Sequence, residues 1–289
     1  MNRIFYGIIY AFSLLPFKIL YGFSWLIYIV LNYFIGYRRK VIYQNLKNSF
    51  PEKSEKEIKQ IQKKFYKNFS DYLVETLKSL SISIEELDKR HTYSNLEIFK
   101  ECQSDKKNVM MMAGHIFNWE WFVAMGPNVQ TPHTVAVYHK VKNKFWNEQI
   151  NKIRGKFGTI QLDMKNTPRF MMSTPNDGSH AYLFVADQSP KRSAIHYDLE
   201  FLNQTTPVFI GFDKIAIKKN MAVVFCNMVK VKQGHYHTTF EQILPDGEKF
   251  EEMEIVHKFF EKLEITIRNN PDNWLWSHKR WKFKKGIDY

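Results

Sequence analysis

From residue 109 onward, apolar and polar positions alternate in blocks that predict strands and helices in turn. Residues 109–113 are all apolar and are followed by Gly114, as in a buried strand that ends in a tight turn. Further strands are predicted over residues 134–138, 181–186 and 221–226, and helices over residues 144–157, 206–219 and 250–268. This order predicts an α/β fold with a central, mostly parallel sheet flanked by helices.

A long amphipathic helix is predicted ahead of this region. Ser54 and Glu57 have the spacing of a capping box, which marks a helix start. The apolar positions that follow keep three-to-four spacing, at Ile58, Ile61, Phe65, Phe69, Leu73 and Leu77. One face of this helix is therefore expected to be buried.

The N-terminus carries the longest uncharged segment, residues 19–36, which includes Trp25 and is followed by the basic triplet 38–40. Its 18 residues are barely enough to span a bilayer, and the triplet would stay on the cytoplasmic side. Because the basic residues follow the apolar run and no small-residue cleavage site comes after it, a removed signal peptide is not expected. We predict an N-terminal apolar membrane-anchor helix within residues 1–40 and a catalytic domain over residues 41–289. This helix could span the membrane or lie in its plane, and the alternative to both is an aromatic-rich helix packed on the domain.

Charge and cysteine content restrict the partners. Lys and Arg outnumber Asp and Glu by 42 to 29, a net charge of +13, which suits nucleic acid, an anionic bilayer or an acidic carrier protein. The two cysteines, Cys102 and Cys226, lie far apart without metal-ligand spacing. We expect reduced thiols and no metal site. His235 and His237 alternate as on a strand, a pattern more typical of surface residues than of a metal site.

The most informative motif for chemistry runs from Gly114 to Glu120. If His115 ends the strand and Asn118 caps a new helix, Glu120 falls in the first turn and can fold back toward the imidazole. Glu120 would then fix the tautomer of His115 and stabilise the imidazolium that forms when His115 takes a proton. With no serine or cysteine nucleophile beside it, the pair suggests that the substrate supplies the nucleophile. A structural hydrogen bond is the alternative.

Three other clusters stand out. Arg154 lies at a helix end just before a glycine, where a cation also simply complements the helix C-terminus. Asp187 and Gln188 follow a predicted strand at the edge where α/β sheets bind ligands, although an aspartate there is equally a turn former. The tail mixes tryptophans, including Trp274 and Trp276, with cationic side chains. This mix suits nucleic acid or a membrane interface, and the apolar N-terminus favours contact with the membrane.

Together these motifs resemble the bacterial lipid A biosynthesis acyltransferases, the late or secondary Kdo-dependent enzymes of the lysophospholipid-acyltransferase-like superfamily. The resemblance rests on residues 114–120, on Asp187 and Gln188, on the segment 276–282, and on the N-terminal segments 36–40 and 45–51. It implies a fold like that of glycerol-phosphate acyltransferases, with His115 as general base and Glu120 as its partner. Arg154 would bind the acyl or phosphate end of a substrate, and Asn118, Asp187 and Gln188 would shape the site.

The expected function is transfer of a fatty acyl chain from a thioester to a hydroxyl of a lipid A precursor, directly and without an acyl-enzyme. The donor would be acyl-carrier protein or coenzyme A as co-substrate, with no further cofactor. An anionic lipid acceptor and the membrane are the expected partners, and nucleic acid is not. The protein would lie at the bacterial inner membrane with its catalytic domain on the cytoplasmic side. The alternatives are a lysophospholipid or aminolipid acceptor, or a non-catalytic lipid-binding protein.

Overall fold

The computed structural model describes residues 2–289 and is built around one seven-stranded sheet of order β1-β9-β8-β2-β5-β3-β4. Strands β8, β2, β5, β3 and β4 are mutually parallel, and β9 runs antiparallel to β8. The strands are β1 (His91–Ser94), β2 (Val109–Ala113), β3 (His133–Tyr138), β4 (Ile160–Asp163), β5 (His180–Val185), β8 (Ala222–Lys232) and β9 (His235–Ile243). A separate hairpin joins β6 (Asp198–Phe201) and β7 (Gln204–Pro207). The predicted α/β class is confirmed.

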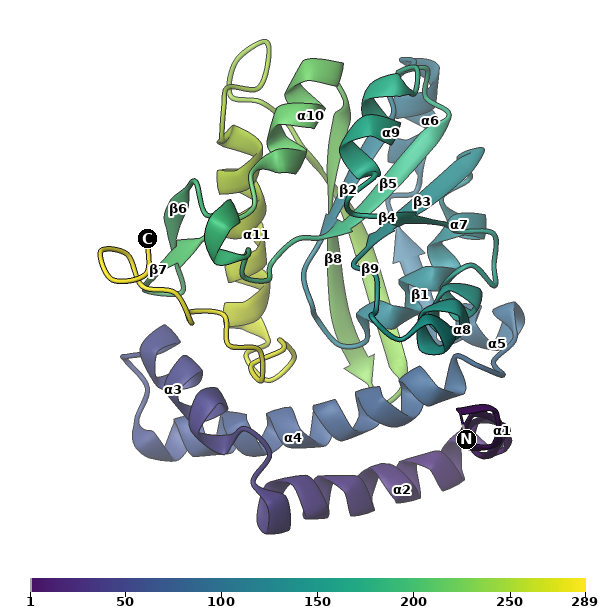
Figure 1. Ribbon diagram of the computed structural model, residues 1–289, viewed down its shortest axis with the longest axis vertical. Coiled ribbons are helices and arrows are strands. Elements are labelled where there is room, and N and C mark those ends of the chain that lie inside the picture. Colours follow the sequence, from purple (N-terminus) through teal and green to yellow (C-terminus); the bar gives the residue numbers. More distant parts are fainter. Residues whose placement is uncertain (1) are drawn as a thin grey trace.

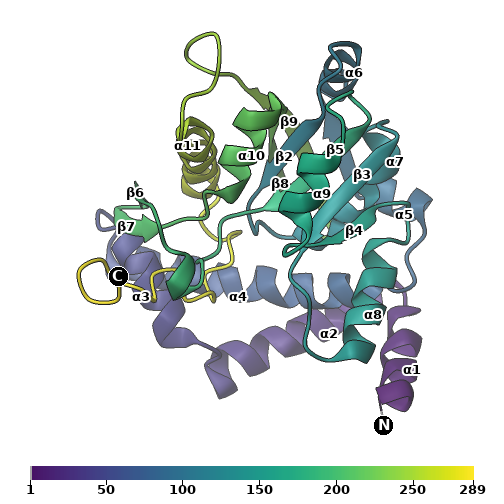
Figure 2. The same ribbon diagram turned by 45° about the horizontal axis from the view of Figure 1, so that its top comes forward.

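Helices cover both faces of the sheet (Figures 1 and 2). In the N-terminal third they are α1 (Asn2–Ser13), α2 (Phe17–Ile29), η1 (Val30–Ile35), α3 (Arg39–Ser49), α4 (Glu55–Lys78), α5 (Ile84–Asp88) and α6 (Glu97–Ser104). The others are η2 (Trp119–Ala124), α7 (Met125–Asn128), α8 (Lys144–Arg154), α9 (Thr167–Ser173), η3 (Arg192–Ala194), α10 (Gly211–Lys219) and α11 (Glu254–Asn269). Figure 1 shows α4 crossing beneath the sheet and α2 lying along the outer side of α4.

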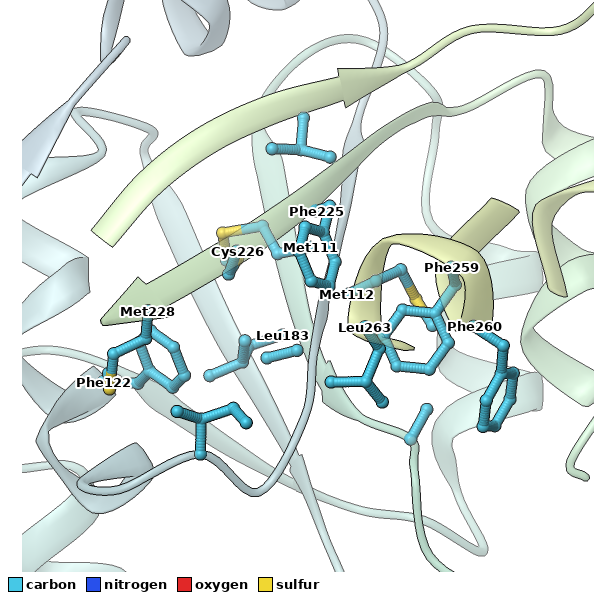
Figure 3. Close-up of a cluster of buried hydrophobic side chains, with 14 of the residues drawn as sticks. Met111, Met112, Phe122, Leu183, Phe225, Cys226, Met228, Phe259, Phe260 and Leu263 are labelled. Atoms are coloured by element: carbon cyan, nitrogen blue, oxygen red, sulfur yellow. The ribbon is translucent and has the colours of Figure 1, made fainter. Parts of the chain in front are cut away.

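The core lies between the sheet and these helices. Figure 3 shows Met112 and Phe225 of neighbouring strands facing Phe259 and Leu263 of α11. The α11 helix comes so close that a Cβ at Gly114 would lie 2.5 Å from Leu263, so a glycine is needed where the chain leaves β2. Both cysteines are buried and free.

The α4 helix begins as predicted, with the full Ser54–Glu57 capping box, and buries Ile58, Phe65 and Phe69. Several other boundaries differ from the prediction: the helix predicted over 144–157 ends at Arg154, and the one predicted over 250–268 begins at Glu254. Two further differences come from strand pairing. The predicted helix over 206–219 begins only at Gly211, because Gln204–Pro207 pairs with β6 as the second strand of the hairpin. The predicted strand over 221–226 extends to Lys232 because its polar end pairs with β9.

The N-terminal apolar helix is present. Phe17–Ile35 is the one segment among the described residues 2–289 that is long and apolar enough to cross a membrane, and 11% of it is buried inside the protein. Its side chains are largely exposed, including Trp25 at 60% and Phe34 at 80%. By length and composition this is weak evidence for a membrane anchor.

Candidate active site

His115 and Asp187 meet because they leave the sheet at the same edge. β2 and β5 are parallel neighbours in which Ala113 pairs with Val185. His115 and Asp187 each lie two residues beyond these paired positions. The carboxyl ends of adjacent parallel strands are where α/β sheets place ligands. The fold therefore brings together two side chains that are 72 residues apart in sequence.

The carboxylate of Asp187 holds His115 with both oxygens. Oδ1 lies 2.5 Å from His115 Nδ1, and Oδ2 accepts the backbone N–H of His115 at 3.0 Å. Oδ2 also accepts the indole N–H of Trp274 at 2.6 Å. Asp187 is fully buried, and burial alone would raise its pKa, but His115 and the other donors hold the pKa at about 2. Asp187 is thus an anion at neutral pH.

This arrangement decides the tautomer of a neutral His115. An ionised carboxylate only accepts hydrogen bonds, so the proton on the imidazole sits on Nδ1. The lone pair of Nε2 then points away from Asp187 and accepts a hydrogen bond from the amide of Gln188, 3.0 Å away. In the neutral imidazole, Nε2 is therefore the nitrogen able to take a proton, and in this structure it contacts the Gln188 amide.

The predicted contact between Glu120 and His115 is wrong. Glu120 instead accepts a bidentate pair from Arg154, with Nε at 3.0 Å and Nη2 at 2.6 Å. The rigid fork of the guanidinium matches both carboxylate oxygens, and Asp187 already satisfies the imidazole from the adjacent strand. Burial alone would lower the pKa of Arg154, but the Glu120 carboxylate outweighs it and raises the pKa.

The predicted cap at Asn118 is present. Its Oδ1 accepts the backbone N–H of Glu120 at 3.2 Å, and η2 begins at the next residue. The ring of Trp119 then stacks on Tyr72 of α4, with 4.3 Å between the ring centroids. It packs edge-on against the imidazole of His115, with 4.9 Å between the centroids. The segment after His115 is thus fixed by α4.

A mostly apolar cavity of about 590 Å³ opens beside this cluster. His115, Gln188, Glu120 and Arg154 line it together with apolar side chains that include Val137, Ile150, Leu183, Phe209, Phe212 and Ile215. Lys165 and Lys191 also line it. A long apolar wall with a few converging polar groups suits a ligand that has a hydrocarbon chain and a polar reacting end.

The segments that build this site all lie within a stretch of sequence that matches one known protein family. Residues 3–283 match the sequence model of the bacterial lipid A biosynthesis acyltransferases. The chain belongs to this family. It is therefore an enzyme, an acyltransferase of lipid A biosynthesis. The comparison with curated proteins gave no match.

The tryptophans Trp274 and Trp276 in the C-terminal tail of this acyltransferase are buried inside the protein. The prediction that Trp274 and Trp276 contact the membrane is wrong, since they are 2% and 0% exposed. Trp274 donates to Asp187, and Trp276 donates to the carbonyl of Pro271 at 2.6 Å. A tryptophan beside cations in sequence does not distinguish a membrane interface from a buried indole whose N–H has a partner.

The tail is held by the N-terminal motifs of the acyltransferase. Asn45 of α3 donates to the carbonyls of Trp276 and His278, at 2.9 and 3.0 Å, and Arg38 donates to the carbonyl of Ser277 at 2.8 Å. Segments from the two ends of the chain therefore pack side by side, a contact that no local sequence pattern predicts.

The tail also buries a cation near the site. Arg280 is fully buried, and none of its guanidinium nitrogens has a hydrogen-bond partner among residues 2–289. Burial lowers the pKa of Arg280 to about 10, while the field of Asp187 opposes that shift. The guanidinium remains charged at neutral pH. Among the same residues, no cluster of His, Cys, Asp or Glu could hold a metal ion.

Proposed function

We propose that this acyltransferase moves a fatty acyl chain from a thioester, carried by acyl-carrier protein, to a hydroxyl of a lipid A precursor. His115 is the general base, and Asp187 is the carboxylate that orients it. The observation that carries the proposal is the placement of His115 Nε2 on the wall of an apolar cavity while Asp187 holds Nδ1. A general base in the wall of an apolar cavity can deprotonate an acceptor hydroxyl next to an acyl thioester whose hydrocarbon chain fills that cavity.

The reaction balances without an acyl-enzyme. The acceptor hydroxyl takes the place of the Gln188 amide and gives its proton to His115 Nε2 while its oxygen attacks the thioester carbonyl. Asp187 stabilises the imidazolium that results. The C–S bond then breaks, and the thiolate takes the proton from Nε2. Both cysteines are buried within the core, which supports direct transfer.

Arg154 and Glu120 act as a pair on the substrate side. The bidentate contact uses Arg154 Nε and Nη2 and leaves Nη1 outside the pair. This group would bind a phosphate or carbonyl oxygen of a substrate, and Glu120 would fix its direction. Lys165 and Lys191 add positive charge along the cavity, which together with the net charge of +13 favours an anionic acceptor lipid and an acidic carrier.

The N-terminal helices would hold the enzyme on the cytoplasmic face of the inner membrane, with α1 and α2 lying in the membrane plane. Ser24 of α2 donates to Asp71 of α4 at 2.6 Å, and Phe5 of α1 packs on Trp146 of α8 with 5.9 Å between the ring centroids. If α2 spanned the bilayer with these contacts intact, α8 and the lysine-rich α4 would enter the hydrocarbon, at a high cost in free energy. An in-plane anchor avoids this cost and leaves the apolar side chains of both helices facing lipid.

Mass spectrometry of lipids tests the proposed reaction. Cells that lack the protein should accumulate a lipid A precursor that is short by one acyl chain, and the purified enzyme should restore the chain from acyl-carrier protein. The His115→Ala variant should fail to restore it. His139→Ala is the matched control, because His139 lines the same cavity but has no place in the mechanism. Loss of an acyl chain from a phospholipid or aminolipid would identify a different acceptor, and an unchanged lipidome would contradict acyl transfer altogether.

A further inference from the structure

Glu75 of α4 joins three separate parts of the protein in the interior. It is fully buried, and its carboxylate accepts hydrogen bonds from Tyr21 of α2, Tyr236 of β9 and Asn118 in the segment after His115. The three bonds measure 3.0, 2.8 and 3.2 Å. Burial raises the pKa of Glu75, while the bonds from its neighbours and the charge of Lys230 act to lower it. Such a buried acidic group is retained at a cost in free energy and calls for an explanation.

On the side of the active site, Glu75 fixes the direction of the Asn118 amide. Asn118 Nδ2 donates to Glu75 Oε2, which turns Oδ1 toward the backbone N–H of Glu120. The amide therefore starts η2 in one orientation only. The same segment carries Trp119 against His115, and Glu120 toward Arg154.

On the side of the anchor, Glu75 receives the hydroxyl of Tyr21 on its other oxygen, Oε1. One turn away on each helix, Ser24 donates to the buried Asp71 at 2.6 Å. The apolar helix α2 is thus attached to α4 by polar groups as well as by packing. Of these two bonds, only the one from Tyr21 reaches the carboxylate that also holds Asn118.

We propose that Glu75 is a positioning residue that sets the segment 115–120 and, through Tyr21, makes that setting depend on the seating of the anchor helix α2. The inference rests on the proposed function, because it requires that this segment carry the reaction. When α2 leaves α4, Glu75 loses one of its three donors, and Asn118 loses part of the structure that orients it. The enzyme then works best with its anchor seated, as it would be on the membrane that supplies its substrate.

The test is the rate at saturating substrates, kcat, measured on full-length enzyme in detergent or lipid. Tyr21→Phe removes only a hydroxyl and should lower kcat by about twofold to tenfold, the usual effect of one lost hydrogen bond, while KM for the acyl donor stays nearly constant. Glu75→Leu should lower kcat by about tenfold or more through misplacement of the segment. Glu75→Gln should recover most of it, because its one oxygen still accepts from Asn118 and Tyr21 can accept from its amide.

A double-mutant cycle separates this route from a general loss of stability. Tyr21→Phe should have no further effect on kcat in the Glu75→Leu protein, since the two residues act in series. If Glu75→Leu does not fold, the same loss of effect is expected in an Asn118→Ala background. Tyr33→Phe is the matched control, because Tyr33 lies in the same apolar segment and its hydroxyl bonds to Tyr28 rather than to Glu75.

An equal effect of Tyr21→Phe in both backgrounds would overturn the proposal, as would unchanged kcat in Tyr21→Phe or in folded Glu75→Leu. These results leave the proposed function standing as long as the wild-type protein transfers acyl chains and His115→Ala does not. Absence of acyl transfer by the wild-type protein would instead contradict the proposed function.

Discussion

The indole of Trp274 donates a hydrogen bond of 2.6 Å to Asp187, although 87 residues separate them in sequence. Because the same carboxylate bonds to His115, Trp274 helps to fix the position of Asp187 and, through it, of the imidazole. Trp274→Phe keeps the ring and removes the donor, so acyl transfer should fall by about threefold to tenfold, with membrane association unchanged. Trp276→Phe is the control, since its N–H bonds to Pro271 and not to the site. Equal rates in both variants would contradict this role.

The pairing of Arg154 with Glu120 makes a second prediction. Arg154→Lys keeps the charge but cannot form the bidentate contact, so turnover should fall by about tenfold or more. Glu120→Gln should act similarly, and the double variant should be scarcely worse than either single one, because the two residues form one unit. Steady-state kinetics of the three purified variants checks this. Additive losses would show that the two residues act separately.

The pH dependence of stability should reflect His91. This side chain is fully buried next to Thr238, and burial lowers its pKa to about 3. Between about pH 6.5 and 3 the unfolded chain binds a proton that the folded one does not, so stability rises with pH across this window. The contribution is complete above about pH 6.5 and is lost as pH falls toward 3. His278, whose pKa burial lowers to about 4, acts in the same direction.

Denaturant unfolding at several pH values measures this effect. His91→Gln should flatten the fall in stability between about pH 6.5 and 4, because no proton uptake remains at this position. The exposed His139 provides the control, and His139→Gln should leave the slope as in the wild type. If the free energy of unfolding falls equally steeply with decreasing pH in all three proteins, His91 does not cause the pH dependence.

The anchor makes a fourth prediction. Phe34 and Trp25 are 80% and 60% exposed on the apolar segment, and a charge at either position would have to enter the membrane interface. Phe34→Glu combined with Trp25→Glu should shift the protein from the membrane to the soluble fraction without lowering its melting temperature. Ile265→Glu, at a position 53% exposed on α11, should not. Unchanged fractionation of the double variant would show that the body of the protein holds the membrane by itself.

A tag on the N-terminus tests the in-plane orientation separately. With α1 and α2 in the membrane plane, the tag and the catalytic domain lie on the same side. Protease added to sealed inner-membrane vesicles with the cytoplasmic face outward should therefore remove the tag. A tag that is protected until the vesicles are opened would indicate a spanning helix.

The sequence was sufficient for the elements whose apolar pattern is strong. β2 and β5 were predicted because both are apolar runs, and α4 because its capping box and periodicity agree. β4 and β9 carry too many polar positions to be recognised alone, and they are defined by pairing with β3 and β8. The order of strands in the sheet depends on long-range packing that no local pattern encodes.

For the candidate site, the sequence singled out residues that lie close together in the fold, but it did not predict which of them contact each other. His115, Glu120, Arg154, Asp187 and Gln188 all reach one cluster, yet nearness in sequence suggested Glu120 for the imidazole where the neighbouring strand brings Asp187. The pairing of β2 with β5 decides this, and only the fold shows it. The burial of Trp274 could not be predicted for the same reason, since its partner lies in another part of the chain.

The most direct test of the central claim is a kinetic cycle on His115 and Asp187. Turnover of purified enzyme with an acyl-carrier-protein thioester and a lipid A precursor is measured for His115→Ala, Asp187→Asn and the double variant, with melting temperatures as the control for folding. We expect each single change to lower turnover by about a hundredfold to ten-thousandfold and the double variant to be no worse than His115→Ala. Wild-type turnover in a correctly folded His115→Ala protein would contradict the account.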